Sequence, residues 1–207
     1  MHLNYVDFVI MVVLILGIFR GRKRGMSEEL LTFVQWLIII LAGAKVYEVT
    51  GKLLAEHAPF SLMACNLAVY LAFAILVKLV FSQIQRAVGE KLVGSNFFGE
   101  SEYYLGMLAA MVRFGCVILM LMAVLNARLI TDKERADTAR MQQKNFEGIS
   151  FPTFGSVQQS VLYESLAGQQ VKTHLAFLLI RPSVSENIPL RPNENRALNE
   201  VLGTAKR

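Results

Sequence analysis

The stretch Arg20-Gly21-Arg22-Lys23-Arg24-Gly25 separates two apolar segments, at about residues 3–19 and 30–47. Its only side chains are basic, and glycines interrupt it, so it predicts a tight polar turn between two helices. Short loops rich in arginine and lysine stay on the cytoplasmic side of a membrane. We therefore predict that this basic turn sets the topology of the chain, through Arg20, Arg22, Lys23, Arg24 and Gly25.

Two more apolar segments, at about residues 60–81 and 103–127, bring the predicted number of transmembrane helices to four. Runs of about 20 apolar residues match the thickness of a bilayer core. The composition agrees, because 54% hydrophobic and 18% charged residues leave little polar surface for a soluble domain. The first segment carries Asp7 and runs into cations, unlike a secretory signal, so we expect a retained anchor.

Local signals refine two of these helices. Ser27 is predicted to cap the second helix, with Glu28 and Glu29 in a first turn that favours carboxylates. After the third helix, residues 82–92 alternate apolar and charged positions at helical spacing. This pattern predicts that the chain bends onto the membrane surface there.

A change of composition near Asn126 divides the chain into a membrane domain, residues 1–127, and a polar tail, residues 128–207. Within the tail, residues 157–180 predict an amphipathic helix that lies on the membrane or closes the helix bundle. The predicted fold is therefore all-α, a multipass membrane protein of four transmembrane helices with a partly helical C-terminal tail.

With the basic turn in the cytoplasm, four crossings place both the N-terminus and the C-terminal tail outside the cytoplasm. The basic residues that follow the last helix oppose this orientation: Arg128, Lys133, Arg135, Arg140 and Lys144. We give them less weight, because long segments translocate largely regardless of charge.

The residues that carry chemistry predict no catalytic site, no cofactor site and no metal site. No nucleophile stands with a base, and no phosphate-binding loop or metal-ligand spacing occurs. Cys65 and Cys116 lie in apolar segments without a CxxC motif. The net charge of +5 is explained by contact with lipid headgroups, so the lipid bilayer, and not nucleic acid, is the expected partner.

Arg113 is the residue that most needs an explanation, because a charge in the middle of an apolar helix is costly. Gly106 and Ala110 share its helix face and predict close packing with another helix. We predict an intramembrane pair between Arg113 and Asp7. The alternative is that Arg113 reaches backbone carbonyls or water, and that Asp7 only caps the first helix.

Two blocks of residues resemble the colicin V production protein family of small bacterial inner-membrane proteins. The first comprises Asp7, Arg24-Gly25-Met26, Glu29, Leu31 and Trp36; the second comprises Leu105-Gly106, Ala110 and Arg113. Ala110 and Phe114 stand where the family pattern has glycines. Over residues 3–127, the resemblance implies a multipass protein of the bacterial inner membrane linked to toxin production and envelope homeostasis, with no established catalytic residue to carry over.

The sequence leaves two functions open. The first is a non-enzymatic accessory or scaffold protein that binds envelope proteins. The second is a subunit of an oligomeric channel or transporter, in which Asp7, Asn66 and Arg113 line a polar route through a homo-oligomer. An intramembrane enzyme would need a reactive pair of side chains at matching depth, which the sequence does not suggest.

Overall fold

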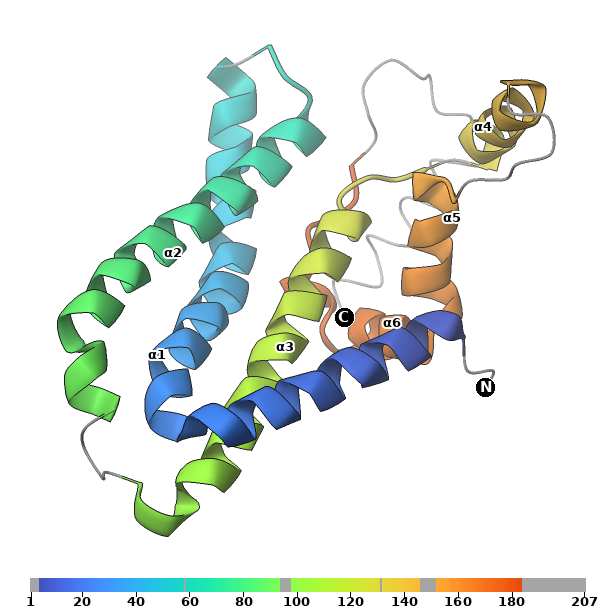
Figure 1. Cartoon of the computed structure of the whole chain (residues 1–207). Helices are drawn as coiled ribbons and strands as arrows, with labels where there is room; N and C mark the ends of the chain where they lie inside the picture. Colours follow the sequence, from blue (N-terminus) through green and yellow to red (C-terminus); the bar gives the residue numbers. More distant parts are fainter. Residues whose placement is uncertain (1–3, 58, 94–97, 131, 146–151, 184–207) are drawn as a thin grey trace.

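The computed structural model describes residues 4–57, 59–93, 98–130, 132–145 and 152–183 (Figure 1). This part of the chain is helical and contains no strand, only an isolated bridge between Arg128 and Ser183. The predicted all-α class is therefore confirmed. The helices and helical turns are, in order, α1 (Tyr5–His57), α2 (Leu62–Val93), η1 (Gly99–Ser101), α3 (Glu102–Asn126), α4 (Asp132–Asn145), α5 (Phe154–Gln159), η2 (Ser160–Glu164), α6 (Leu166–His174) and η3 (Ala176–Leu178).

A sharp corner at Gly25 divides α1 into a first arm, residues 5–24, and a second arm, residues 26–57 (Figure 1). Gly25 has φ 75° and ψ 174°, a conformation that side chains with a Cβ disfavour. The predicted basic turn is thus wrong in extent: residues 20–24 remain helical and the chain changes direction at Gly25. Arginine and lysine are good helix formers, so only the glycine supplies a break.

Three of the described helices are long and apolar enough to cross a membrane: α1, residues Leu62–Val88 of α2, and Gly99–Asn126, which includes α3. The first two predicted membrane helices are the two arms of α1, so the predicted number of four is not confirmed. Large apolar side chains such as Phe8, Leu79 and Leu108 remain exposed on these helices. Such surfaces suit contact with lipid chains better than contact with water.

The first arm of α1 crosses α3 at very short range. A Cβ atom added to Gly21 would lie 2.5 Å from the Cβ of Ala110, and one added to Gly106 would lie 2.6 Å from the carbonyl carbon of Gly25. Gly21 and Gly25 share one helix face, as do Gly106 and Ala110, because each pair is four residues apart. Both predicted packing residues of α3 therefore lie in this contact.

The second arm of α1 packs against α2, which runs antiparallel to it. Tyr70 of α2 is fully buried, lies close to Gly43 and contacts the ring of Tyr47 edge to face, with 6.3 Å between ring centroids. α2 is one continuous helix to Val93, so the structure shows no helix break at the predicted bend after residue 81 (Figure 1).

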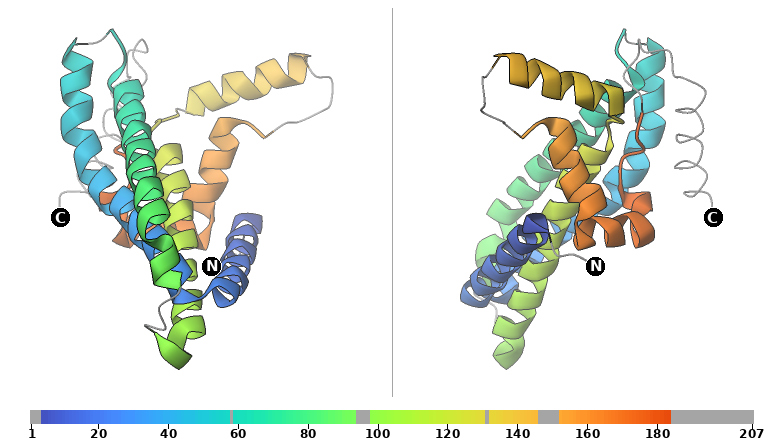
Figure 2. Two further views of the ribbon diagram at one scale, coloured as in Figure 1. Left: turned by 60° about the vertical axis from the view of Figure 1, so that its left-hand side comes forward. Right: turned by 90° about the vertical axis from the view of Figure 1, so that its right-hand side faces the viewer.

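The described part of the tail returns to the helices after α4, which projects from them (Figure 2). Leu162, Leu179 and Ile180 are buried in the same core as Tyr47 and Met122. This part of the tail therefore shares a core with the membrane helices. Residues 184–207 of the predicted tail lie outside the described residues.

The predicted amphipathic helix 157–180 is not continuous. It is divided into α5, the π-helical turn η2, α6 and the 3-10 turn η3. The break falls at Ser165, whose backbone is extended and whose hydroxyl accepts a hydrogen bond from the amide of Gly168 at 2.9 Å. Serine side chains that bond the backbone in this way start helices and interrupt longer ones.

Two glycines of α3 provide a matched test of the helix crossing. Gly106→Ala is expected to destabilise the protein by about 1–3 kcal/mol, because the added methyl group meets backbone of the first arm. Gly115→Ala should be neutral or slightly stabilising, because no atom lies within 4 Å of the added Cβ and alanine favours helix. Reversible unfolding in mixed detergent micelles measures both changes, and equal effects would contradict the close crossing.

Candidate functional site

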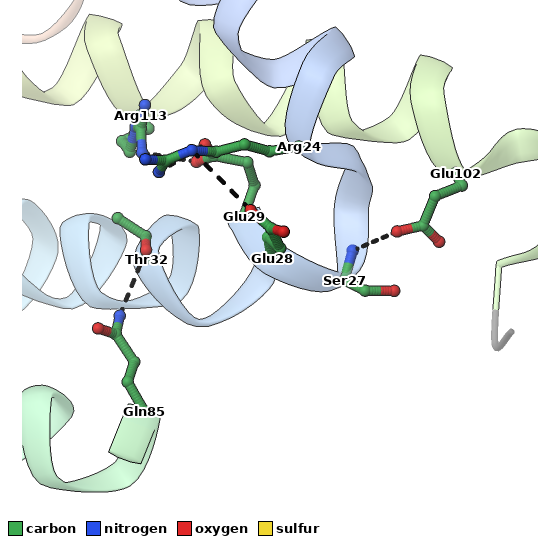
Figure 3. Close-up of polar contacts among 8 residues, drawn as sticks. All are labelled: Arg24, Ser27, Glu28, Glu29, Thr32, Gln85, Glu102 and Arg113. Carbon is green, nitrogen blue, oxygen red and sulfur yellow. Dashed lines mark hydrogen bonds and ion pairs between the residues drawn. The ribbon is translucent and has the colours of Figure 1, made fainter. Parts of the chain in front are cut away.

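Arg113 of α3 forms a buried ion pair with Glu29 of the second arm (Figure 3). The distance from Nη1 to Oε2 is 2.6 Å; Glu29 is 0% exposed and Arg113 is 7% exposed. Arg24 lies 3.5 Å from the other oxygen of Glu29 and is partly exposed. Neither oxygen of Glu29 has a well-directed hydrogen bond within the described chain, so the two guanidinium groups compensate its buried charge.

The corner in α1 explains why these charges meet. Gly106 packs against Gly25, so the start of the second arm lies beside α3. Glu29 is one helical turn beyond the corner, and Arg113 is about two turns beyond Gly106 along α3. The long arginine side chain spans the remaining gap, and its guanidinium also lies 4.8 Å from the ring centroid of Phe114.

A second carboxylate completes the corner. Glu102, at the start of α3, accepts a hydrogen bond of 2.8 Å from the backbone amide of Ser27 (Figure 3). The first amides of a helix have no partner within that helix, and a carboxylate also interacts favourably with the helix dipole. The predicted start of the second arm near Ser27 is therefore close to the observed one, but the stabilising carboxylate comes from α3.

The structure does not bring Asp7 and Arg113 together. Asp7 accepts hydrogen bonds of 3.0 Å each from the amides of Leu166 and Ala167, the first residues of α6. It also accepts a bond of 3.1 Å from the amide of Asn4. Asp7 thus caps the first arm, as the alternative interpretation holds, and in addition it caps a helix of the tail.

Other polar side chains hold the tail at the far end of the bundle. The hydroxyl of Tyr47 donates to the carbonyl of Leu179 at 3.3 Å and accepts from the amide of Arg181 at 3.0 Å. Asn126 donates to the carbonyl of Ile180 at 2.9 Å. The carbonyl groups at the end of α3 receive bonds from Gln158 of α5. The tail is therefore attached by polar contacts as well as by its apolar core.

The other residues singled out in the sequence take no part in these contacts. Arg20, Arg22 and Lys23 are exposed beside the corner. Cys65 and Cys116 are buried, free thiols. Among the described residues, no group of three or more His, Cys, Asp or Glu side chains could hold a metal ion.

Sequence reasoning did not identify Glu29 as the partner of Arg113, although a signal was present. Gly21 and Gly25 repeat the four-residue spacing of Gly106 and Ala110. Matching these two pairs of small residues places the start of the second arm next to Gly106. From there Glu29 is within reach of Arg113, whereas Asp7 is about 27 Å further back along the first arm, at 1.5 Å per residue.

Three long apolar helices in the described part of the chain, with exposed apolar side chains and a charge pair buried between them, are typical of a multipass membrane protein. The sequence model of the Colicin V production protein family matches residues 6–170, so the chain belongs to that family. The match extends beyond α3 into α6 and includes both sides of the contact between Asp7 and the tail. No curated protein and no solved structure matches the chain.

A double-mutant cycle tests the ion pair. Glu29→Gln should destabilise the protein by about 3–5 kcal/mol, because it leaves Arg113 buried without a partner. Arg113→Gln should cost less, because Arg24 still lies 3.5 Å from Glu29. The double variant should lose less than the sum of the two, with a coupling free energy of about 0.5–3 kcal/mol. Unfolding in mixed micelles gives the three values. The cycle Asp7→Asn with Arg113→Gln is the control and should be additive; coupling there, or its absence in the first cycle, would contradict the assignment.

Removal of the Asp7 charge should loosen the tail. In Asp7→Asn the side chain keeps one acceptor oxygen for the amides of α6 and loses its interaction with the helix dipole. Trypsin should then cut more rapidly after Lys172 of α6 in the detergent-solubilised protein. Asp137→Asn, on an exposed face of α4, makes the same change away from this contact and should leave the rates unchanged. Equal cleavage of the two variants would show that Asp7 does not hold the tail.

Proposed function

We propose that this protein is a non-enzymatic accessory or scaffold protein of the bacterial inner membrane that serves toxin production and envelope homeostasis. Family membership over residues 6–170 is the observation that carries the proposal. The site chemistry supports it, because Asp7, Glu29, Glu102 and Arg113 are all engaged in contacts between helices. Side chains used in this way build a rigid platform rather than a reaction centre.

The proposal includes four crossings, one for each arm of α1 and one each for α2 and α3. The contact of Asp7 with α6 places the start of α1 and the described tail together. The basic corner at Gly25 lies at the other end of the first arm. If the corner is cytoplasmic, as its arginines favour, α4 projects outside the cytoplasm, where it is available to envelope proteins.

A channel subunit is the less supported alternative. Arg113 contacts Glu29 at the corner, while Asp7 lies about 27 Å away along the first arm. Asn66 packs against Gly51, about 33 Å from Glu29 along the second arm. The three side chains suggested for a polar route therefore lie at separate levels of the bundle.

Position 141 of α4 allows tests of both orientation and partner binding. Met141 is 66% exposed on α4, so Met141→Cys should react with a membrane-impermeant maleimide in cells whose outer membrane alone is permeable. Arg22→Cys at the corner should react only after the inner membrane is opened. A photocrosslinker at position 141 should capture an envelope protein, whereas one at lipid-facing Phe8 should not.

Liposomes that contain the purified protein should conduct no ions or small solutes above the level of empty liposomes. Measurable flux, together with crosslinks only between copies of this chain, would overturn the scaffold proposal and favour the channel. Maleimide labelling of Arg22→Cys in intact spheroplasts would instead overturn the orientation.

A further inference from the structure

A cavity of about 450 Å³ lies between the second arm of α1, α2 and Met120 of α3. Its volume is within the range of small-ligand sites. None of the contacts that hold the fold at Arg113 or Asp7 involves it. Its lining divides into two parts, one polar and one apolar.

The polar part of the cavity has side chains that the protein does not satisfy. Gln35 is only 6% exposed, lines the cavity and forms no hydrogen bond with any other described residue. Lys78 also lines the cavity and has no ion-pair partner in the described chain. An amide that lines a cavity open to lipid and has no hydrogen bond is costly, because lipid chains cannot replace the water that would satisfy it. These two residues therefore indicate a ligand that accepts hydrogen bonds and carries negative charge.

The apolar part continues from the same two helices. Ile39 and Met120 line it on one side, and Leu71 and Ala74 line it on the other. Ile75 lines the opening and is 60% exposed on the outer surface of α2. Because this surface faces lipid in a multipass protein, the cavity opens sideways into the bilayer.

The order of the lining residues follows the membrane depth. Thr32 and Gln85 lie closest to the basic corner and are joined by a hydrogen bond of 3.3 Å (Figure 3). Gln35 and Lys78 come next, and Ile39 and Leu71 lie deeper, since the second arm and α2 run antiparallel. Lys78 is the first charge of α2 and lies one turn before the end of its apolar segment at about residue 81. The polar part is thus near the headgroups and the apolar part is near the acyl chains.

We propose that this cavity binds one anionic phospholipid from the leaflet on the side of the basic corner. Lys78 and Gln35 donate hydrogen bonds to its phosphate group, Thr32 and Gln85 close the polar end, and one acyl chain lies along Ile39, Ala74 and Leu71. A single cation with no acidic partner in the cavity selects a negatively charged headgroup over a zwitterionic one. The occupant is a lipid rather than a free anion because the greater part of the lining is apolar.

Native mass spectrometry of the full-length protein in detergent tests the proposal, with dioleoyl phosphatidylglycerol as the probe and dioleoyl phosphatidylcholine as its neutral counterpart. One phosphatidylglycerol should remain bound in preference to phosphatidylcholine. Lys78→Gln should weaken its binding by about five- to tenfold, as expected for loss of one cation at the headgroup. Lys78→Arg should retain binding. Arg86→Gln, the same charge change on α2 outside the cavity lining, should alter binding much less.

Ile75→Trp gives an independent test through the apolar part. The larger side chain should block the opening and abolish retention of the lipid, while the exposure of Ile75 lets the fold accept it, which a thermal unfolding curve checks. Three outcomes would each overturn the proposal. They are equal losses of binding in Lys78→Gln and Arg86→Gln, equal retention of the two lipids, and full displacement of the lipid by inorganic phosphate. The first of these outcomes would indicate diffuse attraction to the surface, and the last would indicate a free-anion site.

Discussion

The backbones of α1 and α3 approach each other closely at the corner because Gly21, Gly25 and Gly106 have no Cβ atoms there. Three other features of the bundle depend on this contact. It turns the chain at Gly25, places the first amides of the second arm beside Glu102, and brings Glu29 within 2.6 Å of Arg113. In a membrane, where apolar burial gives helices little reason to associate, such close packing and the polar contacts that it allows are the main attractive terms.

The ion pair results from this geometry and also restricts it. A buried pair contributes less stability than its charges suggest, because each ion loses its hydration. A sliding motion of α3 along α1 would separate Arg113 from Glu29, leaving Arg113 buried without an anionic partner and Glu29 with Arg24 alone. The pair therefore disfavours other registers of the two helices more than it stabilises the observed one. Asp7 acts similarly at the other end of the first arm, because its carboxylate fits only when α6 presents its first amides.

Sequence patterns predicted the features that depend on local properties. The apolar segments, the start of the second arm near Ser27 and the small-residue face at Gly106 all follow from composition and spacing. The pairing of Arg113 was wrong, because opposite charge and similar expected depth do not define which helices touch. The prediction for the tail was also incomplete. Its apolar pattern indicated one amphipathic helix, whereas a new helix starts at Leu166 because the hydroxyl of Ser165 and the carboxylate of Asp7 accept hydrogen bonds from its first amides. Contacts between residues far apart in the chain decided both outcomes.

The polar side chains that line the cavity differ from those at the corner and at α6. At the corner and at α6, carboxylates are matched with guanidinium groups or helix amides from another element. Gln35 and Lys78 are different, since Lys78 forms no ion pair and Gln35 forms no hydrogen bond with any other described residue. Gln35 is buried without a hydrogen bond, which is unfavourable for the free protein, and a ligand that offers acceptors to Gln35 and Lys78 is stabilised by binding there. A bilayer offers such a ligand at the right depth, with its phosphate near the polar part and its acyl chain beside the apolar part.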